Sequence, residues 1–303
     1  MQLFPKKLSQ IYLVLFVSAF LTITGNFTFF QKTILIYPLS ENWLFLGSLF
    51  FFLFTFLAAL LLLFCYRVTT KPILMVLLMI SAIVSYSTNN YGIVFDHNMI
   101  LNTFETDTSE FLDLVSFKSI LYFFIFGLLP SIFVLKVKLK KISFKAQLWE
   151  RIKTFLVLVI IFVIIVLTFS KHYSSFAREN RDLRLYITPT YYLYSATKFV
   201  DSKFATSTKP FKEIGLDAKL NKKSDTRRLV ILVVGETARA DHMSLNGYDR
   251  NTNPYLEQEE IISFDKMTSC GTDTALSVPC MFSLLDRSSY NHAKGKNMSN
   301  VLD

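Results

Sequence analysis

Residues 43–65 read WLFLGSLFFFLFTFLAALLLLFC, a run of 23 residues without a charged side chain. At about 1.5 Å per residue, a helix of this length measures roughly 35 Å, enough to cross the ~30 Å hydrocarbon core of a bilayer. Four other stretches are also apolar and long enough to cross. The five predicted spans are residues 11–30, 43–65, 73–91, 119–135 and 154–170. The sequence therefore predicts an integral membrane protein with five transmembrane helices.

Two of these stretches have unusual features. Lys6 and Lys7 precede the first, which is the pattern of a cleavable signal peptide, but the four later spans favour a retained helix. The fourth contains Gly127 and Pro130. We expect neighbouring helices to satisfy the backbone groups that this proline leaves without a partner.

The basic residues are sorted between the connections. The N-terminus and the connections 66–72 and 136–153 together hold 11 Lys and Arg residues and one acid, whereas the connections 31–42 and 92–117 hold one base and six acids. By the positive-inside rule, the first set is cytoplasmic and everything after about residue 170 is exported. The net charge of +9 is therefore a topology signal, and we expect no nucleic-acid partner.

Beyond the spans the composition changes twice. Residues 171–228 are polar with scattered Tyr and Phe, which favours amphipathic helices and linkers near the membrane surface. Residues 229–234, LVILVV, are typical of a strand buried in a parallel sheet, and residues 261–264 predict a weaker strand. The predicted parts are a transmembrane domain at 1–170, a periplasmic amphipathic linker at 171–228 and the incomplete start of an α/β domain at 229–303.

Two segments of the exported part carry chemistry. Glu236 follows the predicted strand, where a carboxylate can hold a metal such as Zn²⁺ or can equally favour a helix N-terminus. Residues 268–282 contain a Thr-rich turn after Gly271, where a hydroxyl could meet a phosphate, although such turns are also common helix caps. Cys270 and Cys280 could pair in an oxidising compartment, and a metal site is the alternative.

A third candidate group lies in the acidic connection 92–117. Asn102, Thr106 and Glu110 are spaced by four residues, which puts them on one face of a helix. A solvated acidic loop is the alternative. His242 follows an aspartate, and we interpret it as a surface helix residue and not as a metal ligand.

Residues 233–240 read VVGETARA, residues 247–254 read GYDRNTNP and residues 269–283 read SCGTDTALSVPCMFS. These motifs strongly resemble the bacterial phosphoethanolamine transferases, the inner-membrane enzymes that decorate lipid A and include the transferable colistin-resistance enzymes. The third motif is long and gapless, which makes the resemblance specific.

The resemblance implies a five-span anchor in the bacterial inner membrane and a periplasmic, sulfatase/alkaline-phosphatase-like α/β domain that works with Zn²⁺. By position, Glu236 matches a zinc ligand, and Thr274 matches the nucleophile that also binds the metal. Cys270 and Cys280 match a family disulfide. The residues that match contacts to the donor lipid headgroup are Asn102, Thr106 and Glu110.

The activity implied by the resemblance is transfer of phosphoethanolamine from phosphatidylethanolamine to Thr274, and then to a phosphate of lipid A. Polymyxin resistance is expected of the family. No Asp-His-Gly segment like the one that completes the family's zinc site occurs in the chain, so we expect the chain as given to be an inactive N-terminal fragment. The alternatives are transfer to another lipopolysaccharide acceptor, such as a core sugar, and a non-catalytic, lipid-binding membrane remnant.

Overall fold

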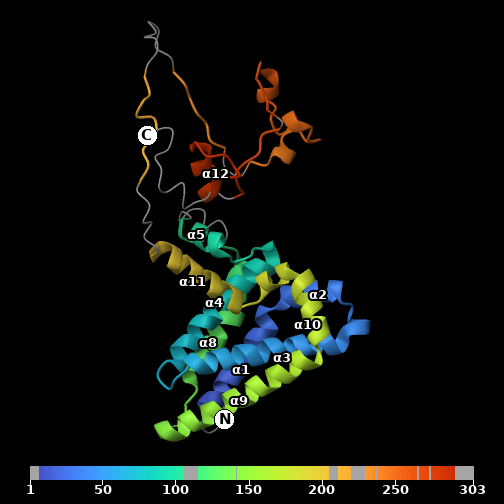
Figure 1. Cartoon of the computed structure of the whole chain (residues 1–303), viewed down its shortest axis with the longest axis vertical. Coiled ribbons are helices and arrows are strands. Elements are labelled where there is room, and N and C mark those ends of the chain that lie inside the picture. Colours follow the sequence, from blue (N-terminus) through green and yellow to red (C-terminus); the bar gives the residue numbers. More distant parts are fainter. Residues whose placement is uncertain are drawn as a thin grey trace. The chain divides into compact units, whose positions relative to one another are not determined.

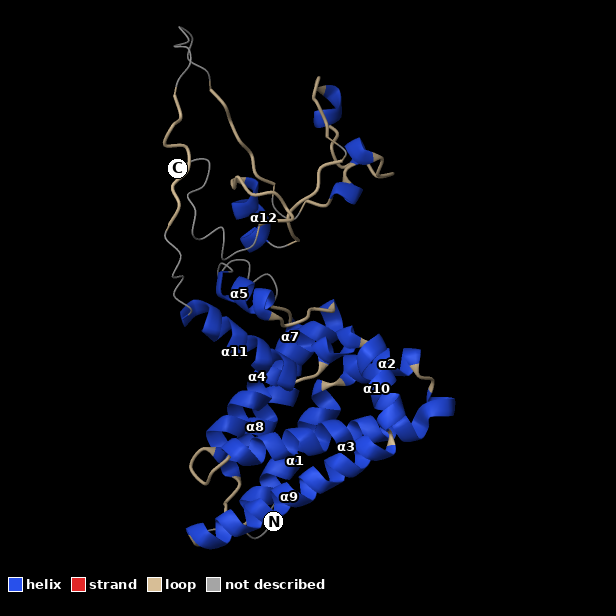
Figure 2. Cartoon of the chain, in the orientation of Figure 1, coloured by secondary structure: helices blue, strands red, loops and turns tan. Residues whose placement is uncertain are grey.

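The chain divides into two compact units, Met1–Phe204 (unit 1) and Ala205–Asp303 (unit 2). Most of their α-helices are labelled in Figures 1 and 2, and the ranges described contain no β-strand (Figure 2). The computed structural model describes residues 7–105, 115–140, 142–204, 211–219, 229–235, 238–264, 266–272 and 274–290.

Unit 1 is helical along almost all of its described length. The first six helices are α1 (Gln10–Gly25), α2 (Phe27–Ile36), α3 (Leu39–Phe64), α4 (Thr70–Tyr91), α5 (His97–Glu105) and α7 (Phe117–Phe123). They are followed by the π-helical turn η1 (Phe124–Leu128), α8 (Leu129–Lys136), α9 (Phe144–Thr168), α10 (Ser170–Glu179), the 3₁₀ helix η2 (Arg181–Tyr186) and α11 (Thr190–Phe204).

Within the described residues, four helices are long and apolar enough to cross a membrane: α3, α4, α9 and the continuous run Phe117–Lys136. The pair α1 and α2 meets the same test together, although the two helices are bent by 58°, so the number is five if this pair is one span. Each predicted span overlaps one of these elements. The membrane part of the predicted fold class is therefore confirmed.

The bend between α1 and α2 is centred on Asn26, whose backbone leaves the helical region at φ −116° and ψ 24°. Its side-chain amide donates to the Leu21 and Thr22 carbonyls at 3.2 and 3.3 Å, which helps to close the end of α1. The same amide donates to the Thr188 carbonyl at 2.8 Å and accepts from the Thr188 N–H at 2.9 Å. Asn26 therefore also fastens α1 to the segment that precedes α11.

The π-helical turn η1 lies directly before Pro130, which has no N–H to donate. The helical ladder widens there, and the Leu129 N–H binds the Phe124 carbonyl. Ser131 Oγ donates to the Gly127 carbonyl at 2.6 Å. The carbonyl that Pro130 leaves without its usual donor is that of Phe126, four residues earlier, so the predicted help from neighbouring helices stays a prediction.

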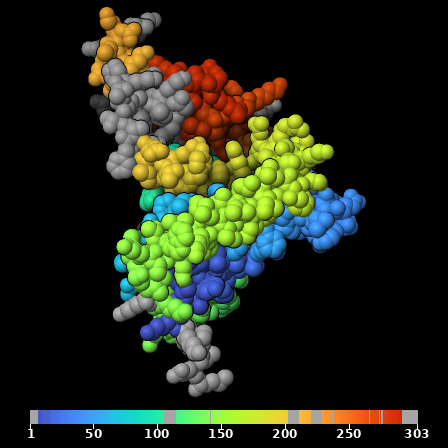
Figure 3. Space-filling model, turned by 60° about the horizontal axis from the view of Figure 1, so that its bottom comes forward, coloured from blue at the N-terminus to red at the C-terminus, as the bar shows by residue number. Residues whose placement is uncertain are grey.

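The main core of unit 1 lies where α1, α3 and α4 meet. Leu13, Val14 and Val17 of α1 are buried in one cluster with Leu61 of α3 and Leu78 of α4. By contrast, α9 packs on α3 and leaves most of its aliphatic side chains exposed, and Figure 3 shows it lying along the surface. Lipid tails are as apolar as leucine, so this exposure is expected of a helix that faces lipid.

The three basic segments of the sequence meet at one end of unit 1. The Leu8 N–H binds the Lys138 carbonyl at 2.9 Å. Gln10 Nε2 donates to Thr70 Oγ1 at 2.5 Å, and Gln147 donates to the Gln10 side-chain carbonyl. The segments that form this basic end are residues 7–10, 65–71, 136–140 and 142–153. This arrangement agrees with the alternation of basic and acidic connections from which the topology was predicted. The side of the membrane that the basic end faces stays a prediction.

Unit 2 has little regular structure in its described residues. Its helices are η3 (Ala240–His242), η4 (Ser244–Asn246), η5 (Leu256–Gln258) and α12 (Thr274–Met281). The strands predicted at 229–234 and 261–264 are not formed, and the side chains of 229–234 are 40–86% exposed. A parallel strand needs neighbouring strands for its N–H and C=O groups, and the described part of unit 2 supplies none. An apolar pattern alone therefore does not make a strand here.

Candidate functional site

The predicted nucleophile, Thr274, is the first residue of α12 and has an exposed side chain. A disulfide joins Cys270, just before this helix, to Cys280 near its end, with 6.3 Å between the two Cα atoms. Ser269 Oγ donates to the Gly271 carbonyl at 2.6 Å and accepts from the Gly271 N–H at 3.3 Å. The turn that presents Thr274 is therefore held by a covalent bond and by local hydrogen bonds.

Gly271 lies close to the first turn of α12. A Cβ atom added there would lie 2.4 Å from Leu276 Cδ2 and 3.2 Å from Leu276 Cγ. A larger residue at position 271 would therefore require the Leu276 side chain to move. The glycine lets the turn and this side chain pack closely.

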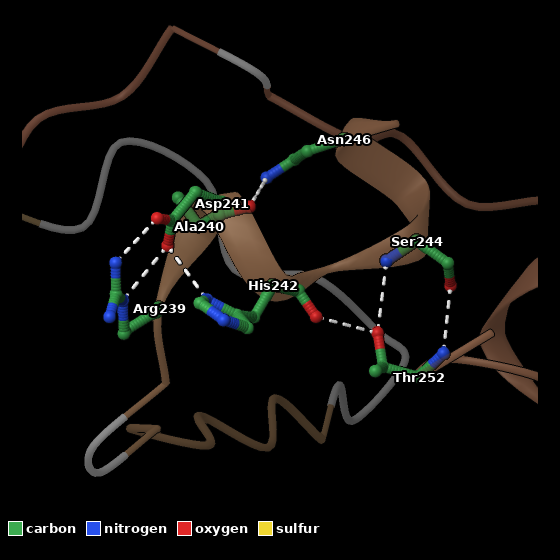
Figure 4. A network of polar contacts seen from close by, with 7 residues as sticks. All are labelled: Arg239, Ala240, Asp241, His242, Ser244, Asn246 and Thr252. Atoms are coloured by element: carbon green, nitrogen blue, oxygen red, sulfur yellow. Dashed lines mark hydrogen bonds and ion pairs between the residues drawn. The ribbon is translucent and has the colours of Figure 1, made fainter. Parts of the chain in front are cut away.

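A second ordered group surrounds Asp241 in the loop that follows the VVGETARA motif (Figure 4). Arg239 Nε and Nη2 donate to its two carboxylate oxygens at 3.0 and 2.6 Å, and His242 Nδ1 lies 3.1 Å from Oδ1. The hydrogen bonds from Arg239, followed by that from His242, lower the pKa of Asp241 to about 2. The carboxylate in turn raises the pKa of Arg239. His242 is exposed and lies in η3. Its side chain contacts the Asp241 carboxylate and the ring of Tyr248.

The second motif, GYDRNTNP, is tied to the first through Thr252. Its hydroxyl donates to the His242 carbonyl at 2.7 Å and accepts from the Ser244 N–H at 3.0 Å (Figure 4). In return, Ser244 Oγ accepts from the Thr252 N–H at 3.3 Å and from the Asn253 N–H at 3.1 Å. Asn246 Nδ2 donates to the Ala240 carbonyl at 2.9 Å. Sequence reasoning missed these positioning roles, although hydroxyl and amide side chains beside an Asn-Gly turn are a usable signal.

The predicted headgroup residues are only partly described. Asn102 is half-buried in α5, while Thr106 and Glu110 lie outside the described residues. The helix that carries Asn102 packs on α11, where the rings of Phe104 and Phe199 are stacked with centroids 5.2 Å apart. The structure therefore fixes the helix that holds Asn102 and leaves the proposed headgroup cluster as a prediction.

The predicted metal ligands are divided in the same way. Thr274 is described, and Glu236 lies outside the described residues. Among the residues that were placed, no group of three or more His, Cys, Asp or Glu side chains could hold a metal ion. A protein zinc site normally takes three or four protein ligands, so the described residues do not by themselves fit one.

Comparison with known proteins gives the class. Residues 53–204 match the phosphoethanolamine transferase EptA/EptB family, and residues 228–303 match the sulfatase family. The fold and the site thus define an integral membrane protein with a C-terminal segment of the sulfatase family.

Individual relatives agree with this class. The chain is 39% identical to phosphatidylethanolamine transferase Mcr-1 of Escherichia coli over 99% of the chain and 57% of the relative. A 53-residue stretch is 49% identical to the Kdo(2)-lipid A phosphoethanolamine 7''-transferase of E. coli K12, which is 18% of this chain and 9% of that protein. The structure of lipooligosaccharide phosphoethanolamine transferase A from Neisseria meningitidis is similar with a TM-score of 0.89 at 30% identity, over 98% of this chain and 56% of that one.

The chain belongs to the phosphoethanolamine transferase EptA/EptB family, as its motifs predicted. It spans a little more than half the length of Mcr-1 and of the meningococcal structure.

Proposed function

We propose that these 303 residues are the membrane anchor and the first part of the catalytic domain of a phosphoethanolamine transferase with Thr274 as its nucleophile. The observation that carries the proposal is the position of this hydroxyl. It is exposed at the start of α12, in a turn closed by Cys270–Cys280, within the segment that matches the sulfatase family. Phosphatidylethanolamine is the proposed donor, and a phosphate of lipid A is the proposed acceptor.

The proposed transfer has two steps, and in each step one bond to phosphorus forms while another breaks. In the first, Thr274 Oγ attacks the phosphorus of phosphatidylethanolamine, the bond from phosphorus to the glycerol oxygen breaks, and diacylglycerol leaves with the proton that the threonine loses. In the second, a lipid A phosphate oxygen attacks the same phosphorus, the bond to Thr274 breaks, and Thr274 Oγ takes the proton that the attacking phosphate hydroxyl loses. A threonine hydroxyl is a weak nucleophile near neutral pH, so the first step requires that Thr274 be activated.

Zinc is the activating metal that we propose for the whole protein, with Glu236 and Thr274 as two of its ligands. A bound Zn²⁺ supplies Lewis acidity and lowers the pKa of an oxygen that it binds. Because the described residues do not fit a complete zinc site, no step is assigned to the metal on this part of the chain.

The donor site that we propose is formed by Asn102, Thr106 and Glu110. A Glu110 carboxylate would pair with the ethanolamine ammonium, and the amide and hydroxyl would bond the phosphate oxygens. The position of Asn102 on α5, which packs on α11, supports a fixed place for this site at the end of unit 1 opposite the basic end.

We infer that the protein lies in the bacterial inner membrane with the basic end in the cytoplasm. Residues 171–228 would then be a periplasmic linker, and residues 229–303 would begin the periplasmic catalytic domain. Two observations support this orientation. The basic connections meet at one end of unit 1, and the Cys270–Cys280 disulfide is of the kind that persists in an oxidising compartment.

The test of the nucleophile uses the 303 residues continued by the part of Mcr-1 that lies beyond the match. The purified, monodisperse, zinc-loaded protein is given phosphatidylethanolamine, and the peptide that contains Thr274 is analysed by mass spectrometry. We expect a phosphoethanolamine adduct, which Thr274→Ala abolishes and Thr272→Ala, a loss of the neighbouring exposed hydroxyl, retains. An adduct that persists in Thr274→Ala, or its absence from the folded, zinc-loaded protein, would contradict the proposal.

A second acceptor is favoured by one observation. The 53-residue match is to a relative whose name specifies transfer to a sugar position of Kdo(2)-lipid A. Mass spectrometry of lipid A and of core oligosaccharide from an expressing strain separates the two acceptors. A purely lipid-binding remnant would produce neither modified lipid A nor modified core oligosaccharide, and Thr274→Ala would not change its affinity for lipid.

A further inference from the structure

The basic end of unit 1 contains a cavity that the proposed transfer does not use. It has a volume of about 260 Å³ and opens between the α3–α4 turn and the first two turns of α9. Two arginines and several apolar side chains line it. Those that matter here are Arg67, Arg151, Tyr66, Val68, Phe144 and Leu148.

Arg151 is buried in this wall, with only 6% of its surface exposed. Its Nη1 donates to the Cys65 carbonyl at 2.5 Å, and its Nη2 donates to the Leu62 carbonyl. The guanidinium carbon lies 4.0 Å from the centroid of the Tyr66 ring. Because these carbonyls end α3, the cation meets the negative end of the helix dipole.

These partners leave the charge of Arg151 incompletely balanced. Carbonyls and an aromatic ring offer partial charges, and the two carbonyls use two of its five N–H donors. Over the described residues, neither Arg151 nor the exposed Arg67 forms an ion pair with a carboxylate. A buried cation without an anion carries a large desolvation cost. The cavity therefore has two cations and space for one anionic group between the α3–α4 turn and α9.

The apolar side chains of the cavity indicate what the anion is attached to. Val68 is 84% exposed and Phe144 is 70% exposed, and both lie beside the arginines at the end of a transmembrane bundle. At this depth of a membrane, headgroups and acyl chains meet. Free phosphate would contact the arginines and none of this apolar surface, whereas a phospholipid would contact both.

We propose that this cavity binds an anionic phospholipid, with the phosphodiester against Arg67 and Arg151 and an acyl chain along Val68, Phe144 and Leu148. Basic pockets between transmembrane helices are known to hold acidic lipid headgroups. The lipid supplies the missing counter-charge of Arg151 and joins the α3–α4 turn to α9. This site is separate from the proposed donor site, because Asn102 follows the opposite end of α4.

The proposal is tested on the full chain in detergent by native mass spectrometry with added phosphatidylglycerol or phosphatidylcholine. We expect phosphatidylglycerol to bind on the order of tenfold more tightly, because phosphatidylcholine has the same phosphodiester but adds a quaternary ammonium that offsets its charge beside the two arginines. Arg67→Gln should remove most of this preference. Lys145→Gln should retain it, since Lys145 is a basic residue at the start of α9 that does not line the cavity.

A thermal measurement provides the second readout. It uses variants of the exposed residues Arg67 and Lys145, because a substitution of the buried Arg151 could unfold the protein. Phosphatidylglycerol should raise the Tm of the unsubstituted chain and of Lys145→Gln, but not that of Arg67→Gln, whose exposed side chain makes no hydrogen bond within the described residues. Equal binding of the two lipids would overturn the proposal. An equal loss of the preference for phosphatidylglycerol in Arg67→Gln and Lys145→Gln would also overturn it. Such a result would mean that the lipid is attracted by the basic surface in general and is not bound in the cavity. A Tm rise of the same size with inorganic phosphate would exclude a lipid as the ligand.

Discussion

Replacing Asn26 with alanine removes the connection between the bend of α1–α2 and the segment before α11. The side chain is 1% exposed, and Thr188, whose backbone it binds in both directions, is 5% exposed. The substitution leaves the Thr188 N–H and C=O in a buried site without this partner. The residue after Thr188 is a proline, which restricts how that backbone can turn to find another.

The expected loss of stability follows from these two groups. A buried, unsatisfied backbone group costs about 1–3 kcal/mol, whereas side-chain bonds measured inside membranes average only about 0.6 kcal/mol because alternative partners are found. Since the partner here is fixed backbone, we expect a loss of about 2–4 kcal/mol. For a unit of this size, each kcal/mol shifts Tm by about 2–4 °C, so the Tm of unit 1 should fall by roughly 4–16 °C.

The buried thiol of Cys65 makes the measurement specific to unit 1. It is the free cysteine of the structure, while Cys270 and Cys280 are paired, so a thiol-reactive dye reports the opening of the bundle on heating. Asn42→Ala is a matched control, because Asn42 also breaks a helix (φ −123°, ψ 21°) but is only half-buried, and its side-chain amide donates to the Pro38 carbonyl of the same turn at 3.2 Å. Its Tm should change by no more than a degree or two. Equal Tm shifts for the two alanine variants would refute the reasoning.

Three further outcomes are expected in unit 2. Cys280→Ser removes a cross-link worth about 3 kcal/mol by loop-closure entropy and should speed proteolysis of the 270–281 segment, while Cys65→Ser leaves its rate unchanged. Arg239→Gln should raise the pKa of Asp241 from about 2 toward its ordinary value near 3.9, read from the ¹³C shift of the carboxyl group. Since the folded-state pKa is the lower one, the contribution of this carboxylate to the loop is present above about pH 4 and is lost as the pH falls through about 2. The exposed run 229–234 should be cleaved by protease before the helices of unit 1, and cleavage that begins within α3 or α4 would contradict this expectation.

The membrane spans could be predicted from the sequence because hydropathy and length are properties of each segment alone. The same is true of the sorting of Lys and Arg between connections. The break at Asn26 could not be predicted in this way, because its partner Thr188 lies 162 residues away along the chain. Gly25 and Asn26 are residue types common at helix ends, but nothing near position 26 identifies Thr188 as the partner.

The candidate site was predicted unevenly for a similar reason. The motif around Thr274 is contiguous, so its residues could be recognised together, and the structure places the threonine at a helix start beside the disulfide. The pairing of Ser244 with Thr252 depends on how a loop folds back, and no local pattern specified it. The prediction of a strand at 229–234 was wrong because it used only the apolar side chains of this segment. A strand forms only where neighbouring strands bind its N–H and C=O groups, and these side chains are exposed.

The end of unit 1 opposite the basic end is held together by buried polar contacts and by packed aromatic rings. Asn26 binds the backbone of Thr188, and the hydroxyls of Ser81 and Tyr192 lie 3.1 Å apart, so α1 and α4 both hold the start of α11. Further along, α11 is covered by α5 through the stacked rings of Phe104 and Phe199. The helix that carries the proposed headgroup residue is therefore fixed to the helix from which the chain continues toward unit 2. Buried hydrogen bonds on α1 and α4 thus fix the start of α11, and the packing of α11 on α5 fixes the helix on which we propose that the donor headgroup binds.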